Sequence, residues 1–203
     1  MIHNNCEFCL GLSEVKLAGI TPNNSDPHAR WFKDLENSVN HWIVITHVEL
    51  FTRNKMADAL LKKWGVRFFT DGAGRLSVRD VEKLNRVDSS LRTKGDGEVP
   101  VSKVIERLSF GFWSQLVTKR YESSLWAPVL RNCFTSKAPT KRAEIETAYK
   151  ESVEIRNRIA HHETLSKPRY DGSFKRQLLL LSWLSDSAYE EISARRQEFF
   201  YIK

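Results

Sequence analysis

Residues 141–162 read KRAEIETAYKESVEIRNRIAHH, and this stretch decides the fold class of the chain. At about 100° per residue its apolar side chains fall within one arc of roughly 160°, which is typical of an amphipathic helix. Arg156 lies near the middle of that arc, Asn157 lies at its edge, and His161 follows one turn later. An arginine on a buried stripe costs free energy unless a carboxylate or a partner's groups receive it.

A second helical pattern runs from Trp31 to Trp64. Its apolar seam is formed by Leu35, Trp42, Met56, Leu60 and Trp64. Thr46, Glu49 and Arg53 lie on the centre line of this seam, and the i, i+4 spacing of Glu49 and Arg53 lets them pair. Because two helices each place ionic groups on an apolar stripe, we expect the stripes to meet, with Glu49 receiving Arg156 or Arg53. A buried ion pair that only fixes helix register is the structural alternative.

The remaining patterns are helical as well. Helices are expected at residues 77–91, 102–121, 124–134 and 173–199, and residues 94–100 form the clearest loop. There is neither an alternating strand pattern nor an internal repeat. The sequence therefore predicts an all-α protein, with an N-terminal arm at residues 1–25 and one helical domain at residues 26–203.

The composition of the 203-residue chain excludes wholesale disorder, because 41% of the residues are hydrophobic. The net charge is +7, and residues 61–140 hold 15 basic and 8 acidic side chains, so this part has the whole excess. A candidate surface for a polyanion backbone consists of Lys62, Lys63, Arg75, Arg79, Arg86, Arg92 and Lys94. A solvated helical face explains these residues about as well.

The N-terminus lacks the features of a secretory signal, and the longest apolar run, residues 178–184, is far too short to span a bilayer. We therefore expect a cytoplasmic protein without a membrane partner. Cys6 and Cys9 have the spacing of half a zinc site, with His3 nearby, but no second ligand pair follows and Cys133 stands alone. The sequence predicts neither a bound metal nor a cofactor.

The segment Arg156-Asn157-Arg158-Ile159-Ala160-His161-His162 resembles the Arg-x4-His signature of the HEPN superfamily of helical RNases and nucleotide-linked domains. Two further patterns are similar to the Abi-like (abortive infection) proteins of that superfamily. One is Glu49 with Arg53-Asn54, and the other is Phe110-Gly111-Phe112-Trp113 followed by Leu125-Trp126. The resemblance covers about residues 26–163.

This resemblance implies a HEPN-like helical bundle with additional helices. It implies a metal-independent endoribonuclease that acts as a toxin or antiphage effector on RNA, as a homodimer with apposed motif helices. An antitoxin, either a protein or a small RNA, is a further partner that it implies. Arg156 and His161 are then the catalytic pair and Asn157 positions the substrate, and the supporting residues are Glu49, Arg53, Asn54 and His162.

The residue types suit RNA cleavage by the 2′-hydroxyl group. A histidine exchanges protons near neutral pH, and a guanidinium holds phosphate oxygens in bidentate fashion. Arg156 and His161 are about 140° apart around an ideal helix, so they converge only at a helix end or across an interface.

Three questions stay open at the level of sequence. The first is whether the chain is instead a non-catalytic RNA- or nucleotide-binding HEPN partner protein, or only a structural dimerisation module. The second is whether Lys119, Arg120 and Arg158 contact RNA. The third is whether Tyr121 and Trp126 stack on RNA bases or belong to the core, as aromatic residues at helical spacing usually do.

Overall fold

A computed structural model describes residues 27–92, 99–165 and 168–200, with the side chains of the last turn of this range left out of the description. The predicted N-terminal arm at residues 1–25 lies outside these ranges. The helices are α3 (Pro27–Trp64), α4 (Phe68–Asp71), α5 (Val78–Arg92), α6 (Val101–Arg107), α7 (Phe110–Gln115), α8 (Arg142–Ala160), α9 (Ser173–Leu184) and α10 (Asp186–Phe200). Within the described ranges there is no strand, so the predicted all-α class is confirmed.

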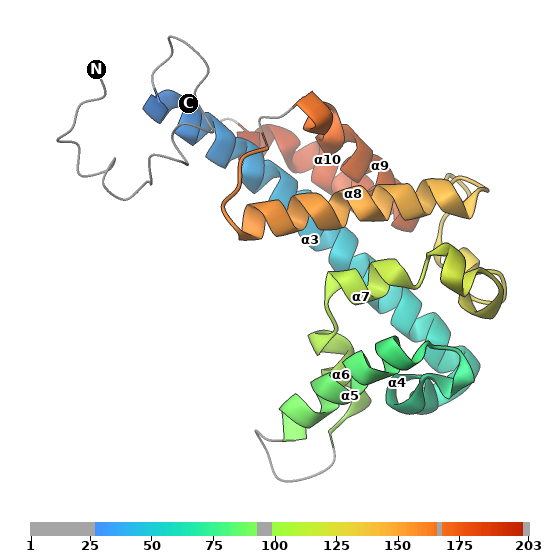
Figure 1. Cartoon of the computed structure of the whole chain (residues 1–203). Helices are drawn as coiled ribbons and strands as arrows, with labels where there is room; N and C mark the ends of the chain where they lie inside the picture. The colour runs from blue at the N-terminus through green and yellow to red at the C-terminus, as the bar shows by residue number, and fades with distance from the viewer. Residues whose placement is uncertain (1–26, 93–98, 166–167, 201–203) are drawn as a thin grey trace.

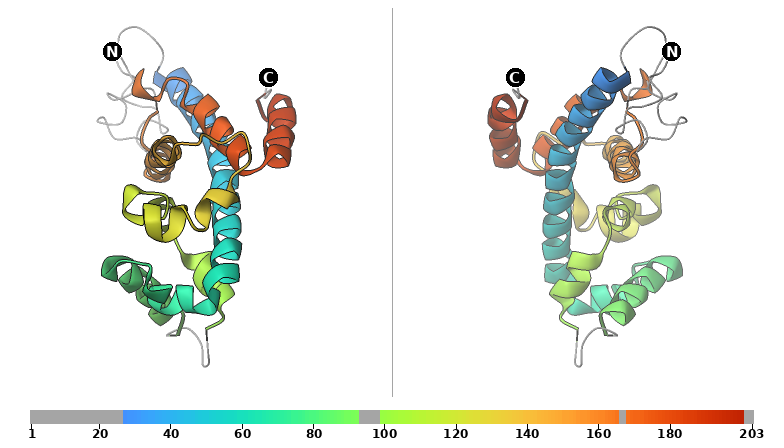
Figure 2. Two further views of the ribbon diagram at one scale, coloured as in Figure 1. Left: turned by 90° about the vertical axis from the view of Figure 1, so that its right-hand side faces the viewer. Right: turned by 90° about the vertical axis from the view of Figure 1, so that its left-hand side faces the viewer.

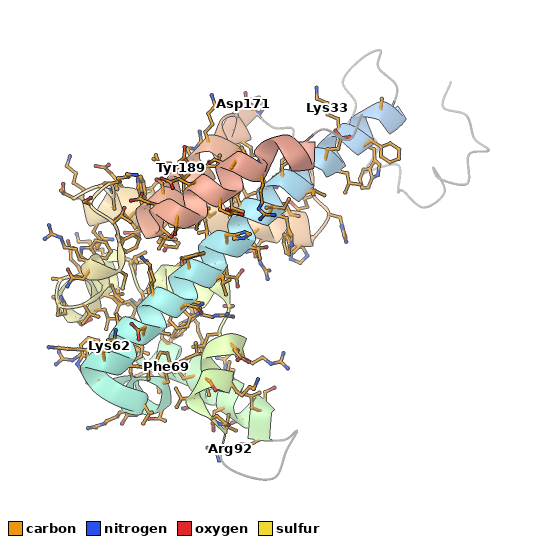
Figure 3. The ribbon with its side chains drawn as sticks, turned by 180° about the vertical axis from the view of Figure 1, so that it is seen from behind. Lys33, Lys62, Phe69, Arg92, Asp171 and Tyr189 are labelled. Atoms are coloured by element: carbon orange, nitrogen blue, oxygen red, sulfur yellow. The ribbon has the colours of Figure 1, made fainter. Side chains whose placement is uncertain are left out.

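Helix α3 is the axis of the molecule. Its 38 residues form one helix of about 57 Å, and the other helices are arranged along it (Figure 1). Helices α8 and α9 pack on α3 towards its N-terminal half, α7 packs further along, and α4 to α6 gather around its C-terminal end. Figure 2 shows α10 on the opposite side of α3 from α8. Seen from behind, Lys33 and Lys62 mark the two ends of α3, and Phe69 lies just beyond its second end (Figure 3).

Local sequence explains where α3 ends and α5 begins. Gly65 adopts a left-handed φ of 66°, which glycine reaches without strain, and it ends α3 as predicted. The chain then turns back through the buried side chains of Phe68 and Phe69. Ser77 caps α5 as predicted, because its Oγ accepts a hydrogen bond from the Asp80 backbone N–H at 3.3 Å.

Three of the predicted helices are divided differently from the expectation. The predicted helix at 102–121 breaks at Leu108, whose ψ of 129° is extended, and Ser109 caps α7 by accepting a bond from the Phe112 N–H at 3.2 Å. The predicted helix at 124–134 consists of short turns, η4 (Glu122–Trp126) and η5 (Leu130–Cys133). The predicted final helix breaks at Ser185, whose backbone is extended (φ −158°, ψ 118°).

The core is built largely from aromatic and branched side chains. Its largest fully buried members include Trp113, Tyr149, Phe68, Ile45, Met56 and Leu60. Tyr121 and Trp126 are only 3% and 6% exposed, so they belong to the core, and the alternative of an RNA-stacking patch is wrong for both. No helix in the described part of the chain combines the length and the apolar composition that a membrane crossing requires.

Candidate active site

Helix α8 holds the motif residues, and a buried hydrogen bond fixes it to α3. The Tyr149 hydroxyl and the Thr52 Oγ1 are 2.7 Å apart, and both side chains are fully buried. Ile145, Ser152 and Ile155 complete the buried face of α8. The C-terminal end of α8 lies beside the N-terminal half of α3 (Figure 1).

Arg156 is half-buried near the end of α8. Its guanidinium carbon lies 5.9 Å from the centroid of the Trp42 ring on α3, which is a cation–π distance. Its Nε is buried and has no hydrogen-bond partner among the described residues. Arg156 is thus a partly desolvated cation that no described carboxylate neutralises.

The predicted ion pair between Glu49 and either Arg156 or Arg53 is wrong. Glu49 is half-buried and forms no ion pair with any residue that the structure describes. Arg53 instead donates from Nε to the Asn54 Oδ1 at 3.2 Å. The reason is that α8 packs on the Thr52 face of α3, which is rotated by roughly 60° to 100° from the seam.

The predicted seam of α3 is buried only in its C-terminal half. Met56 and Leu60 are inaccessible, whereas Leu35 and Trp42 are 45% and 41% exposed. An apolar groove of about 370 Å³ opens along this exposed part of the seam. From α3 it is lined by Trp31, Leu35, Val39, Trp42 and Ile43, and from the end of α8 by Ile159, Ala160, His162 and Glu163.

His161 follows the last residue of α8. Its backbone N–H donates to the carbonyls of Asn157 and Arg158, at 3.0 and 3.2 Å, and so closes the helix. The side chains of Asn157 and His161 are exposed, and neither forms a hydrogen bond with a described residue. Arg156 thus lies inside α8 and His161 lies directly after its last residue, with an exposed side chain.

His162 gives the chain its change of direction. It adopts a left-handed φ of 55°, and its N–H donates to the Ile159 carbonyl at 3.0 Å. Its exposed side chain lines the apolar groove. His162 thus adjoins the candidate site through the groove, while no hydrogen bond or ion pair among the described residues joins Glu49, Arg53 or Asn54 to Arg156.

Arg158 has a structural role in the turn after α8. Its Nε and Nη2 donate to the Thr164 carbonyl at 3.2 and 2.8 Å, and its Nη1 pairs with the Glu163 carboxylate at 2.8 Å. Its guanidinium also lies over the Tyr170 ring, 5.2 Å from the centroid. These contacts hold Arg158 in the turn, and its contact with RNA stays a prediction.

Sequence reasoning missed Asp34, which ties the same turn to α3. The Asp34 Oδ1 accepts bonds from the Thr164 Oγ1 at 2.9 Å and from the Leu165 N–H at 3.2 Å. Asp34 is only 8% exposed. Its spacing from the buried residues His41 and Ile45 follows the helical repeat, so an acidic side chain on an apolar face was the signal.

Lys119 and Arg120 are exposed on the short turn η3 (Lys119–Tyr121). They precede α8 in the sequence. Neither forms an ion pair with a described residue.

No described residues form a group of three or more metal-ligating side chains. His3, Cys6 and Cys9, whose spacing is that of half a zinc site, lie outside the described ranges. Cys133 is buried with its Sγ 3.6 Å from the Lys55 carbonyl oxygen, and burial raises the pKa of its thiol to about 11. This thiol is a core group.

The chain matches no family model, and no match is found among curated proteins or among solved structures. The resemblance to the HEPN superfamily therefore rests on the motifs in the sequence.

Proposed function

We propose that the chain is a metal-independent endoribonuclease of HEPN type that cleaves RNA by attack of the 2′-hydroxyl group. The observation on which this rests is the state of Arg156. It is held against Trp42 with a buried Nε that has no hydrogen-bond partner among the described residues, and it lies five residues before the exposed His161. A cation that is positioned but not neutralised suits an anionic group of a substrate.

The cleavage step needs three groups. A histidine accepts the proton of the 2′-hydroxyl as its oxygen bonds to phosphorus, and a second acid gives a proton to the departing 5′-oxygen. Arg156 holds the phosphate oxygens while their charge increases, and Asn157 orients the phosphate. The products are a 2′,3′-cyclic phosphate and a 5′-hydroxyl.

A homodimer would supply the second histidine, because one chain offers a single Arg156–His161 set. The apolar groove favours this assembly. Leu35, Val39 and Trp42 expose 45%, 51% and 41% of their surface directly beside the end of α8. Pairing two such grooves would bury these side chains and bring the two motif segments together.

In this proposal the protein acts in the cytoplasm as an antiphage effector or toxin, with an antitoxin, either a protein or a small RNA, that restrains it. Support for this role comes from the resemblance to Abi-like proteins. Expression of the wild-type chain is expected to slow growth of a bacterial host, and Arg156→Ala is expected to remove that effect.

One observation favours a second candidate, a non-catalytic RNA- or nucleotide-binding partner. Catalytic histidines are commonly oriented by a hydrogen bond to one ring nitrogen, and the His161 ring makes none with the described residues. This candidate predicts RNA binding without turnover.

The test is an RNA cleavage assay with purified protein in EDTA. Wild-type protein is expected to cleave unstructured RNA, and Arg156→Ala and His161→Ala are each expected to reduce the rate by at least about 100-fold. Matched controls are Arg107→Ala and His47→Ala, since Arg107 is exposed on α6 and the His47 Nδ1 only contacts the Ile43 carbonyl of its own helix. Equal rates in all four variants would remove the catalytic assignment.

A further inference from the structure

Seven of the fourteen basic side chains that the structure describes in residues 61–140 are paired with a nearby carboxylate. The ion pairs join Lys62 to Asp58, Arg67 to Asp71, Lys83 to Asp80, Arg86 to Glu82, Arg92 to Asp88, Lys103 to Glu106 and Lys137 to Asp186. The nearby carboxylates reduce the attraction of these cations for a polyanion. Basic residues in this region without such a partner are better suited to bind one.

Arg79 and Arg120 are two of these, and the fold brings them to one place. Arg79 lies in the first turn of α5 and Arg120 lies on η3, and both line a polar hollow of about 180 Å³. Neither guanidinium forms a hydrogen bond or ion pair with a residue that the structure describes. Gln115 and Thr118 add polar groups to the lining, and Lys119 is an exposed neighbour.

A fixed network forms the floor of the hollow. Asp80 is 3% exposed and accepts bonds from the Ser77 Oγ at 2.9 Å, from the Lys83 Nζ at 2.7 Å and from the Tyr121 hydroxyl. The Lys83 Nζ also donates to the Gln115 Oε1 at 2.5 Å. Through Lys83, these bonds join three residues of the lining, Asp80, Gln115 and Tyr121.

The charge of this floor is balanced. Burial alone would raise the pKa of Asp80, but the hydrogen bonds from Lys83, Tyr121 and Ser77 outweigh it and hold the pKa below its usual value. Asp80 is therefore an anion paired with the Lys83 cation. The two arginines then give the hollow a net positive charge.

We propose that this hollow binds a phosphodiester group of the RNA backbone, through Arg79 and Arg120, at a distance from the candidate active site. The proposal rests on the proposed function, because it takes RNA as the ligand. Guanidinium groups bind phosphate oxygens in bidentate fashion, and a contact of this kind holds any sequence. The buried ring of Tyr121 offers no face for a base, so the contact is to the backbone.

The position of the hollow in the fold indicates how long an RNA must be to contact it. Arg75, in the turn before α5, lies over the Trp64 ring at 5.7 Å, which places the start of α5 at the C-terminal end of α3. Trp42, which holds Arg156, is roughly 33 Å away along the helix axis at about 1.5 Å per residue. The hollow thus contacts only RNA that is long enough to reach it from the cleavage site, and it favours longer substrates.

The experiment measures binding of a fluorescent 2′-O-methyl RNA, which cannot undergo 2′-hydroxyl attack, by anisotropy. The full chain is compared with the double variant Arg79→Gln/Arg120→Gln and with a matched control, Arg67→Gln/Arg86→Gln, which removes the same charge from two ion-paired arginines. We expect Kd to rise about tenfold in the first variant, with a shallower salt dependence, and less than about twofold in the control.

Three results would overturn the proposal. They are no binding by the wild-type chain, an equal loss in both double variants, and displacement of the RNA by an equal concentration of inorganic phosphate, which would indicate a site for free phosphate. Since the probe cannot be cleaved, a failed cleavage assay leaves this binding result interpretable. Thermal melts of the variants serve as the folding control.

Discussion

Trp42 explains why an arginine can lie on the apolar side of α8 without a carboxylate. The Arg156 guanidinium carbon lies over the Trp42 ring, 5.9 Å from the ring centroid, and Arg156 as a whole is half-buried. The sequence alone indicates the anomaly at Arg156 but names the wrong neighbour, Glu49. A helical wheel shows the apolar face of one helix. Which face of α3 meets α8 depends on the side chains of both helices, and the wheel does not show it.

We predict that the Arg156→Lys variant retains the fold but loses RNA cleavage activity. Lysine keeps the positive charge but lacks the planar fork that binds two phosphate oxygens and stacks on an aromatic ring. Cleavage is expected to fall by roughly 100-fold, with a change in the free energy of unfolding below about 1 kcal/mol. Rates and thermal melts check this, and full activity in the variant would contradict the role of Arg156.

The buried side chain of His41 on α3 predicts that the stability of the protein depends on pH. His41 is 2% exposed, its Nδ1 lies 2.6 Å from the Gln177 Oε1, and its Nε2 lies 3.5 Å from the Ser173 hydroxyl. Burial lowers the pKa of His41 from its usual 6.5, and this outweighs the bond to Gln177 and the carboxylate of Glu151, which both raise it.

The sign follows from the lowered pKa. The unfolded chain binds the proton of His41 more readily than the folded chain, so the stabilisation is present above pH 6.5 and is lost as the pH falls below it. The free energy of unfolding is expected to decrease by up to about 1.4 kcal/mol per pH unit. Denaturant titrations of the wild type and His41→Asn test this, and His47→Ala is the control that should keep the slope.

At the scale of the elements, the boundaries that were predicted correctly have strong local signals. Gly65 ends α3, and Ser77 caps α5. The missed breaks also have serine caps, since the Ser185 Oγ accepts a bond from the Ala188 N–H at 3.3 Å. Apolar residues continue on both sides of these serines, so the sequence pattern does not indicate the two breaks. The structure shows them, because α6 and α7 are separate helices, and so are α9 and α10.

The contact between α3 and α8 predicts a coupling between two side chains. Burial raises the pKa of Tyr149, so its hydroxyl stays protonated and can bond to Thr52. Tyr149→Phe leaves the Thr52 hydroxyl buried without a partner, at an expected cost of about 1–3 kcal/mol. The double variant with Thr52→Val is expected to lose less than the sum of the single variants, and additive losses in a denaturant cycle would contradict the coupling.

At the scale of the whole molecule, α3 separates two regions with different chemistry. Its N-terminal half lies beside the end of α8, and its C-terminal end lies near α4 to α6 (Figure 1). Residues of the first region line the apolar groove, and the lining of the basic hollow includes residues of α5, α7 and η3. The net charge of +7 is compatible with a polyanionic partner, but the positions of the basic residues in the sequence do not show which of them form ion pairs in the fold. That distinction depends on the ion pairs of the folded chain.

The exposed groove predicts the oligomeric state. We expect a homodimer in solution, and Leu35→Asp is expected to produce a monomer with little cleavage activity, because it places a charge in the interface. Leu179→Asp is a matched control, since Leu179 is 49% exposed on α9 and Leu35 is 45% exposed. Light scattering measures the mass, and a dimer that survives Leu35→Asp would place the interface elsewhere.

The proposed cleavage mechanism uses no metal, and the chemical ends of the RNA products distinguish it from metal-dependent hydrolysis. Purified protein is incubated with RNA in EDTA, and the new ends are identified by mass spectrometry. We expect 2′,3′-cyclic phosphate and 5′-hydroxyl ends that are absent with Arg156→Ala. Intact RNA, or 3′-hydroxyl and 5′-phosphate ends, would contradict it.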